Sequence, residues 1–157
     1  MSPSSVSNLA WALAHAEFPD RRISKAAART WLDRPRSFKD REASQLAWAL
    51  VRAGAALGDR QLDFFLGLRA FYTEAKLVVM PVHELTNFAW AVAHAVPVSV
   101  SDSSEEHAAA SSFVRCCASV VRSTGRAREV AQRPADAGRL CSACARLGVE
   151  DQGLFAA

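Results

Sequence analysis

The sequence is poor in the residues that mark several common protein classes. Of its 157 residues only four are Cys, seven are Gly and six are Pro. So few cysteines exclude a disulfide-stapled secreted domain and indicate a reducing compartment. No apolar run reaches the roughly 18 residues that a membrane-spanning helix needs, so no membrane partner is expected. Half of the residues are hydrophobic, which is enough for a buried core, and the scarcity of Gly and Pro predicts a mostly helical protein.

Motifs for catalysis are also missing. The chain has no P-loop, no G-x-G-x-x-G and no paired-carboxylate constellation. Its four histidines show no arrangement with Ser, Asp or Cys that suggests a catalytic triad. We therefore expect no enzymatic activity and no cofactor.

What the sequence does contain is an internal repeat. Three similar segments are SNLAWALAHA from Ser7, SQLAWALVRAG from Ser44 and TNFAWAVAHA from Thr86, and a degenerate fourth is GRLCSACARLG from Gly138. The tryptophans of the first three copies lie roughly 40 residues apart, which is the length of one two-helix hairpin with its turns. A repeat of this length predicts an α-solenoid.

Aligned with one another, the four copies form columns with helical spacing. Large apolar residues recur at i, i+4 and i+7, which is one stripe of an α-helix. Two further columns stay small, so that a neighbouring helix can approach closely. The large columns begin with Leu9, Leu46, Phe88, Leu140 and with Leu13, Leu50, Val92, Cys144; the small columns are Ala10, Ala47, Ala89, Cys141 and Ala12, Ala49, Ala91, Ala143.

The predicted fold is all-α: an α-solenoid of about four helix–turn–helix repeats, at residues 4–36, 37–80, 81–133 and 134–157, the last incomplete. First helices are expected at 4–17, 39–53, 81–97 and from Pro134; second helices are expected at 20–33, 59–76 and 104–123. The polar stretch 98–106 predicts a mobile surface loop. Residues 150–157 resemble the start of an unfinished second helix, so more chain or a partner is expected there.

The Asn-Leu-Ala-Trp-Ala-Leu-Ala core resembles the octotricopeptide and heptatricopeptide repeats, which are related to the repeats of FAST-kinase-like proteins. This resemblance implies an α-solenoid that acts on organellar RNA, in mitochondria or plastids, including as a subunit of organellar ribosomes. The chain lacks a recognisable RAP domain and has fewer repeats than are usual in that group. No targeting segment is recognisable before the first repeat, as expected if one has been removed or if the chain is a piece of a longer one.

Three columns face away from the apolar stripe. The first is an amide column ending in arginine, the second holds the tryptophans, and the third holds basic side chains. One interpretation is a surface for single-stranded RNA: amides hydrogen-bond base edges, basic groups hold phosphates and an aromatic ring stacks on a base. The other is structural: amides tie helices together and Trp fills the core between repeats. The columns are Asn8, Gln45, Asn87, Arg139; Trp11, Trp48, Trp90, Ser142; and His15, Arg52, His94, Arg146.

Two further features have alternative interpretations. Arg115 and Arg122 lie seven residues apart on one predicted helix face, within an Arg-rich stretch that suits an RNA backbone or an ordinary solvated helix surface. Cys141 and Cys144 form a C-x-x-C, but no second pair completes a tetrahedral zinc site. Because they replace Ala and Leu or Val in their columns, we expect them to fill the core rather than to bind metal.

Two hypotheses for function follow. The first is an RNA-binding solenoid of an organellar ribonucleoprotein, a mitochondrial ribosome subunit that contacts rRNA being one case. The second is a scaffold that bridges neighbouring proteins of a large organellar complex without touching RNA. The formal net charge of +3 is too small to decide between them.

Overall fold

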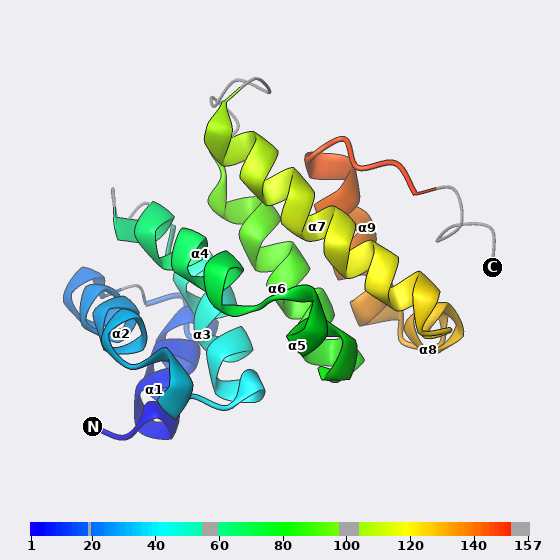
Figure 1. Cartoon of the computed structure of the whole chain (residues 1–157). Helices are drawn as coiled ribbons and strands as arrows, with labels where there is room; N and C mark the ends of the chain where they lie inside the picture. The colour runs from blue at the N-terminus through cyan, green and yellow to red at the C-terminus, as the bar shows by residue number, and fades with distance from the viewer. Residues whose placement is uncertain (19, 55–59, 98–103, 152–157) are drawn as a thin grey trace. The chain divides into compact units, whose positions relative to one another are not determined.

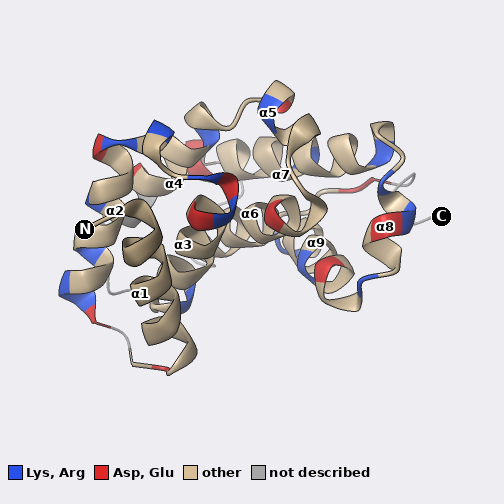
Figure 2. Cartoon of the chain, turned by 90° about the horizontal axis from the view of Figure 1, so that it is seen from below, with Lys and Arg blue, Asp and Glu red and all other residues tan. Residues whose placement is uncertain are grey.

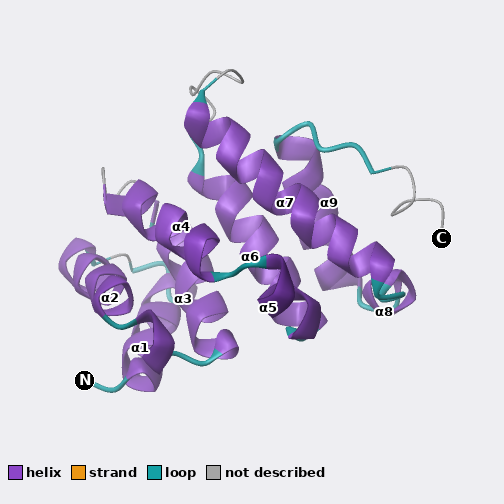
Figure 3. Ribbon diagram, viewed as in Figure 1, coloured by secondary structure: helices purple, strands orange, loops and turns teal. Residues whose placement is uncertain are grey.

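The structure is a computed structural model that describes residues 1–18, 20–54, 60–97 and 104–151. This part of the chain is helical and contains no strand, which confirms the all-α prediction (Figure 3). The helices follow in the order α1 (Pro3–His15), α2 (Arg21–Asp33), η1 (Pro35–Ser37), α3 (Asp40–Arg52), α4 (Arg60–Phe71), α5 (Glu74–Val79), α6 (Val82–Ala95), α7 (Glu105–Ser123), α8 (Ala127–Ala131) and α9 (Pro134–Arg146) (Figure 1).

The chain divides into two compact units, which we call unit 1 (Met1–Phe71) and unit 2 (Tyr72–Ala157). In unit 1, α1 packs against α2 and α3, and α2 packs against α4. In unit 2, α6 packs against α7 and α9, and α8 closes the turn into α9. The first helices of successive repeats are therefore neighbours within each unit: α1 beside α3, and α6 beside α9.

Local sequence signals fix most helix ends where they were predicted. The Asp20 carboxylate caps α2 by accepting hydrogen bonds from the backbone N–H groups of Arg22 and Ile23, at 2.8 and 3.1 Å. The Ser104 hydroxyl caps α7 in the same way, and Pro134 opens α9 as its first residue. The ends of α1 and α6 come two residues before the predicted ones, at His15 and Ala95. Glu17, in a left-handed conformation with φ 53°, ends α1 before the predicted stop at Phe18–Pro19.

The second helix of repeat two is not continuous. A single helix was predicted over 59–76, but the structure breaks it into α4 and α5. Tyr72 is buried beside the Phe88 ring, with the ring centroids 4.6 Å apart, and Thr73 is extended. The Arg126 guanidinium holds the end of α5 by donating to the carbonyls of Val78 and Met80, at 2.7 and 2.6 Å.

Other linkers also differ in detail from the prediction. The basic link 126–133 contains the short helix α8. Of the predicted loop 98–106, residues 98–103 lie outside the described residues, and Glu105 and Glu106 form the first turn of α7. Residues 152–157 of the predicted unfinished helix are likewise outside the described part, and Glu150 and Asp151 are not helical.

The buried tryptophan of unit 1 is Trp31 on α2, not a member of the Trp column. Its side chain is 1% exposed and meets the rings of Phe64 and Phe71 edge-on, at 5.1 and 5.9 Å between centroids. Trp11, by contrast, is 38% exposed. The structural interpretation of that column as core filling therefore does not hold at Trp11.

A glycine allows α2 and α4 to pack at this point. A Cβ atom added at Gly67 would lie 3.1 Å from Trp31 Cζ3 and 3.0 Å from Leu32 Cδ2. The partly exposed Leu32 can move aside, but Trp31 is held by its aromatic neighbours. We predict that Gly67→Ala lowers the free energy of unfolding by about 1 kcal/mol, because overpacking (~1–3 kcal/mol) exceeds the gain in helix propensity (~1 kcal/mol).

Gly138→Ala in α9 is the matched control, because nothing lies within 4 Å of a Cβ atom placed there. Helix propensity alone then acts, and the free energy of unfolding should rise by about 0.5–1 kcal/mol. Urea denaturation followed by circular dichroism measures both. If the two substitutions change stability equally, the close approach of α4 to Trp31 is wrong.

Candidate functional site

The amide, tryptophan and basic columns share one sector of each first helix. An α-helix advances about 100° per residue, so positions 8, 11 and 15 fall within about 60° of one another. The positions opposite, such as Val6 and Ala10, are buried. In α1, Asn8, Trp11 and His15 are all exposed. In α1 the three columns therefore occupy the sector that packing leaves open.

In unit 1 these side chains form a continuous row across α1 and α3. The His15 ring lies between two tryptophans, 4.6 Å from the Trp11 centroid and 6.0 Å from that of Trp48. The Arg52 guanidinium lies 5.7 Å from the Trp48 centroid, within the range of a cation–π contact. Asn8 and Gln45 precede the two tryptophans by one turn. We call Asn8, Trp11, His15, Gln45, Trp48 and Arg52 the unit 1 row.

The unit 1 row holds little fixed charge. Helix α1 contains no Lys, Arg, Asp or Glu (Figure 2). Arg52 lies 3.9 Å from the Glu17 carboxylate, but both side chains are largely exposed, so this ion pair contributes little and Arg52 can exchange it for another anion. The chemistry of the row is that of aromatic faces and amides, with one permanent cation at its end.

In unit 2 the same columns are occupied by internal contacts. The His94 ring stacks on Trp90, with centroids 4.4 Å apart and planes 21° apart. Its Nδ1–H donates to the Trp90 carbonyl at 2.9 Å, and Nε2 accepts from the Ser142 hydroxyl at 3.3 Å. Burial, with a smaller effect of the Arg146 charge, lowers the pKa of His94 below its ordinary value. His94 is therefore a neutral packing residue near pH 7, unlike the phosphate-binding cation of the RNA interpretation.

Arg146 joins α9 to the end of α6. Its Nε–H and one terminal N–H donate to the carbonyls of Ala93 and Val96, both at 2.9 Å. The carbonyls of the last helical turn lack partners within their own helix and attract cations. The predicted RNA-binding Arg146 thus closes the C-terminal end of α6.

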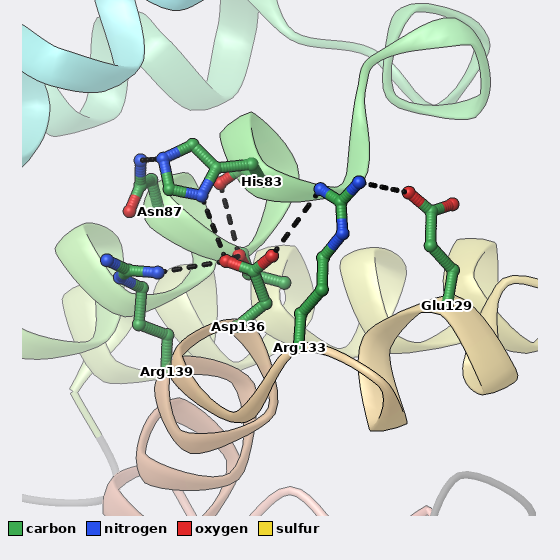
Figure 4. A network of polar contacts seen from close by, with 7 residues as sticks. His83, Asn87, Glu129, Arg133, Asp136 and Arg139 are labelled. Atoms are coloured by element: carbon green, nitrogen blue, oxygen red, sulfur yellow. Dashed lines mark hydrogen bonds and ion pairs between the residues drawn. The ribbon is translucent and has the colours of Figure 1, made fainter.

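Asn87 and Arg139 belong to a network around Asp136 (Figure 4). The Asp136 side chain is buried, and its Oδ1 accepts hydrogen bonds from Arg139 at 2.9 Å, from His83 Nδ1 at 3.0 Å and from the Thr86 hydroxyl at 3.2 Å. Asn87 Nδ2 lies 3.3 Å from His83 Nε2, which completes the chain of contacts. This network ties the start of α9 to the start of α6.

The sequence interpretation missed His83 and Asp136. Each stands at helical spacing from a residue that it singled out: His83 four before Asn87, and Asp136 three before Arg139. That spacing could have suggested the two local pairs. The contact between His83 and Asp136 depends on how α6 and α9 pack, which the spacing does not encode.

Arg115 and Arg122 lie on α7 along an open groove of about 600 Å³. Arg122 is 3.6 Å from the Asp151 carboxylate. Glu74 and Glu150 line the same groove, so its walls carry more carboxylates than guanidinium groups. This mixed charge does not favour a nucleic-acid backbone, which needs an excess of cations.

The cysteines are free thiols in two environments. Cys117 and Cys144 are buried, and burial raises the pKa of the Cys144 thiol to about 11. Cys144 therefore fills the core as predicted, whereas Cys141 is exposed and does not. Within residues 1–18, 20–54, 60–97 and 104–151, no three His, Cys, Asp or Glu side chains come together as metal ligands would.

Comparison with known proteins gives no match among family models, curated proteins or solved structures. None of the described helices is long and apolar enough to cross a bilayer. The repeat motifs and the geometry of the columns are therefore the basis for inferring function.

We predict that the acid dependence of stability reports the burial of His94. Because its pKa is lowered in the folded protein, the unfolded chain binds a proton there first as the pH falls below the ordinary value of 6.5. Above that pH His94 is neutral in both the folded and the unfolded protein, so it does not make the free energy of unfolding depend on pH. The free energy of unfolding should fall from about pH 6.5 downward, until the lowered pKa is passed.

The measurement is urea denaturation of the wild type and His94→Gln between pH 5 and pH 8. The substitution removes the titrating ring, so the difference in free energy of unfolding between the wild type and His94→Gln should become smaller as the pH falls. If that difference stays constant with pH, the His94 ring has the same pKa in the folded and the unfolded protein, and it is not buried against Trp90.

Proposed function

We propose that the first helices stack in parallel as an α-solenoid. Each first helix carries two stripes of residues at helical spacing, which we call the leading stripe and the trailing stripe and list below. Both stripes support this arrangement. The leading stripe faces the preceding first helix, as Asp136 of α9 does when it accepts a hydrogen bond from Thr86 of α6. The trailing stripe faces the following one, as Thr86 and Ala93 of α6 do. Leading stripes are Ser5, Leu9, Ala12; Glu42, Leu46, Ala49; Glu84, Phe88, Ala91; and Asp136, Leu140, Ala143. Trailing stripes are Ser7, Ala10, Ala14; Ser44, Ala47, Val51; Thr86, Ala89, Ala93; and Gly138, Cys141, Ala145.

The burial of these stripes is the pattern that a stack produces. Within unit 1, Leu46 of the α3 leading stripe is fully buried, and within unit 2, Ala89 of the α6 trailing stripe is fully buried. Small residues on the trailing stripe let the large residues of the next helix approach.

We propose further that the protein binds single-stranded RNA through the unit 1 row. The observation that supports this most strongly is the contrast between the units. Trp11 and His15 are exposed, whereas their counterparts Trp90 and His94 are stacked and bonded internally. The exposed Asn8, Trp11 and His15, with the half-buried Gln45 and Trp48 beside them, form a surface suited to a ligand with exposed aromatic faces and polar edges.

Each part of the row has a role in this mechanism. The exposed face of Trp11 stacks on a base, which single strands present and duplexes hide. Asn8 and Gln45 offer both a donor and an acceptor to the edge of a stacked base. Arg52 neutralises a phosphate by leaving Glu17. The row spans two repeats, so it engages about two nucleotides, at roughly one per repeat.

We propose an organellar ribonucleoprotein as the setting, on the resemblance to octotricopeptide and heptatricopeptide repeats. A mitochondrial ribosome, in which the chain contacts rRNA, is the form of this proposal that we favour, and a plastid particle is the alternative. The closed columns of unit 2 favour a second function, a scaffold that holds neighbouring proteins without RNA. Recovery of the chain with the same protein partners after nuclease treatment supports the scaffold, and loss of those partners supports the ribonucleoprotein.

We predict that Trp11→Ala weakens binding to a short single-stranded RNA by about 5- to 150-fold. Loss of one base–aromatic stack costs about 1–3 kcal/mol of binding free energy. Trp90→Ala, the same column in unit 2, should leave the affinity unchanged because that ring stacks on His94. Fluorescence anisotropy with a labelled RNA at fixed salt measures both variants.

Circular dichroism first establishes that both variants are folded. Equal affinities for Trp11→Ala and the wild type contradict stacking at Trp11. An equal loss in both variants shows that the tryptophans act through the fold rather than by contacting RNA. The proposal is also contradicted if the wild type binds duplex RNA as tightly as it binds single-stranded RNA.

A further inference from the structure

The leading stripe of α1 is exposed, although the same stripe is buried elsewhere. Leu9 is 37% exposed, whereas Leu46, Phe88 and Leu140 in the same column are 0, 0 and 1% exposed. Ala12 is also exposed, and its counterparts Ala49, Ala91 and Ala143 are buried. Within unit 1 the copy on α3 packs against α1, and within unit 2 the copy on α9 packs against α6, whereas the copy on α1 is open.

The open surface continues onto α2 as a groove of about 250 Å³. Val6 and Leu9 form one wall, and Ile23 and Ala26 of α2 form the other. Arg34 is the only charged side chain among the residues that line it. The groove is therefore open and mostly apolar.

The opposite surface is open on α9. Gly138, Cys141 and Ala145 form its trailing stripe, and all three are exposed. In α1, the corresponding Ser7, Ala10 and Ala14 are buried. The same trailing positions of α6, Thr86, Ala89 and Ala93, are fully buried.

The chain thus carries both halves of a contact that it already makes internally. In unit 2 the small trailing stripe of α6 receives the leading stripe of α9, and in unit 1 α1 and α3 pack as the corresponding pair. The small stripe of α9 and the large stripe of α1 have the same complementary shapes. We propose that a second copy of this chain docks its α9 trailing stripe into the α1–α2 groove.

Such a contact is heterologous, because it joins two different surfaces of identical chains. Each chain in a pair retains one unused surface, so association continues into longer head-to-tail oligomers unless the geometry closes a ring. Cys141 lies at the centre of one surface and Leu9 at the centre of the other. A charge buried at either centre without a partner opposes the contact strongly.

The test is sedimentation equilibrium of the full chain over a wide concentration series, under reducing conditions so that Cys141 forms no disulfide. The wild type should show an average mass that rises with concentration above the 17.0 kDa of one chain. Leu9→Glu and Cys141→Glu should each stay monomeric. Ala108→Glu, at an exposed position of α7 outside both stripes, should associate as the wild type does.

Mixing the two monomeric variants gives the decisive result. Leu9→Glu retains an intact α9 surface and Cys141→Glu retains an intact α1–α2 groove, so the mixture should form a dimer and nothing larger. A monomeric wild type overturns the proposal, and so does association that survives either substitution. A mixture that stays monomeric also overturns it, because head-to-tail docking needs one surface from each chain. Circular dichroism confirms that the variants are folded, as expected for substitutions at exposed positions.

Discussion

The close approach of one first helix to the next is the constraint on which the rest of this structure depends. It requires a small residue wherever the backbones come together, and the trailing stripe supplies Ser, Thr, Gly, Ala or Cys at every position of the four copies except Val51. Buried Ala89 in α6 and buried Leu140 in α9 show the two sides of this contact. Once parallel helices pack in this way, the amide, tryptophan and basic columns occupy the remaining sector, which is exposed in α1.

The tryptophan column explains why this sector is open in unit 1 and covered in unit 2. In unit 1 the following helix presents Trp48 to His15, and two bulky rings meet edge-on without closing the surface. In unit 2 the following helix presents Ser142, whose hydroxyl bonds to the His94 ring. Because Ser142 is small where the other copies have tryptophan, α9 can cover this sector of α6. Arg146 covers the end of α6 by donating a hydrogen bond to the Ala93 carbonyl.

Features that depend on neighbouring residues were predicted from the sequence. Features that depend on contacts between residues far apart in the chain were not. The Asp20 cap and the start of α9 at Pro134 follow from neighbouring residues, and the repeat identified which helices are equivalent. The end of α5 is held by Arg126, which binds carbonyls almost fifty residues earlier in the chain. The burial of Asp136, and the internal contacts of Asn87, His94, Arg139 and Arg146, likewise follow from the packing of α6 against α9.

The most direct test of the central constraint compares two substitutions in one column. Ala89→Leu places a large side chain in the buried trailing stripe of α6, and Cys141→Leu places the same side chain in the exposed stripe of α9. If small residues are needed for helix approach, urea denaturation should show a loss of about 1–3 kcal/mol for Ala89→Leu. Measured at a concentration at which the chain is monomeric, Cys141→Leu should change stability by no more than about 0.5 kcal/mol, as surface substitutions do. Equal effects at the two positions would contradict the account.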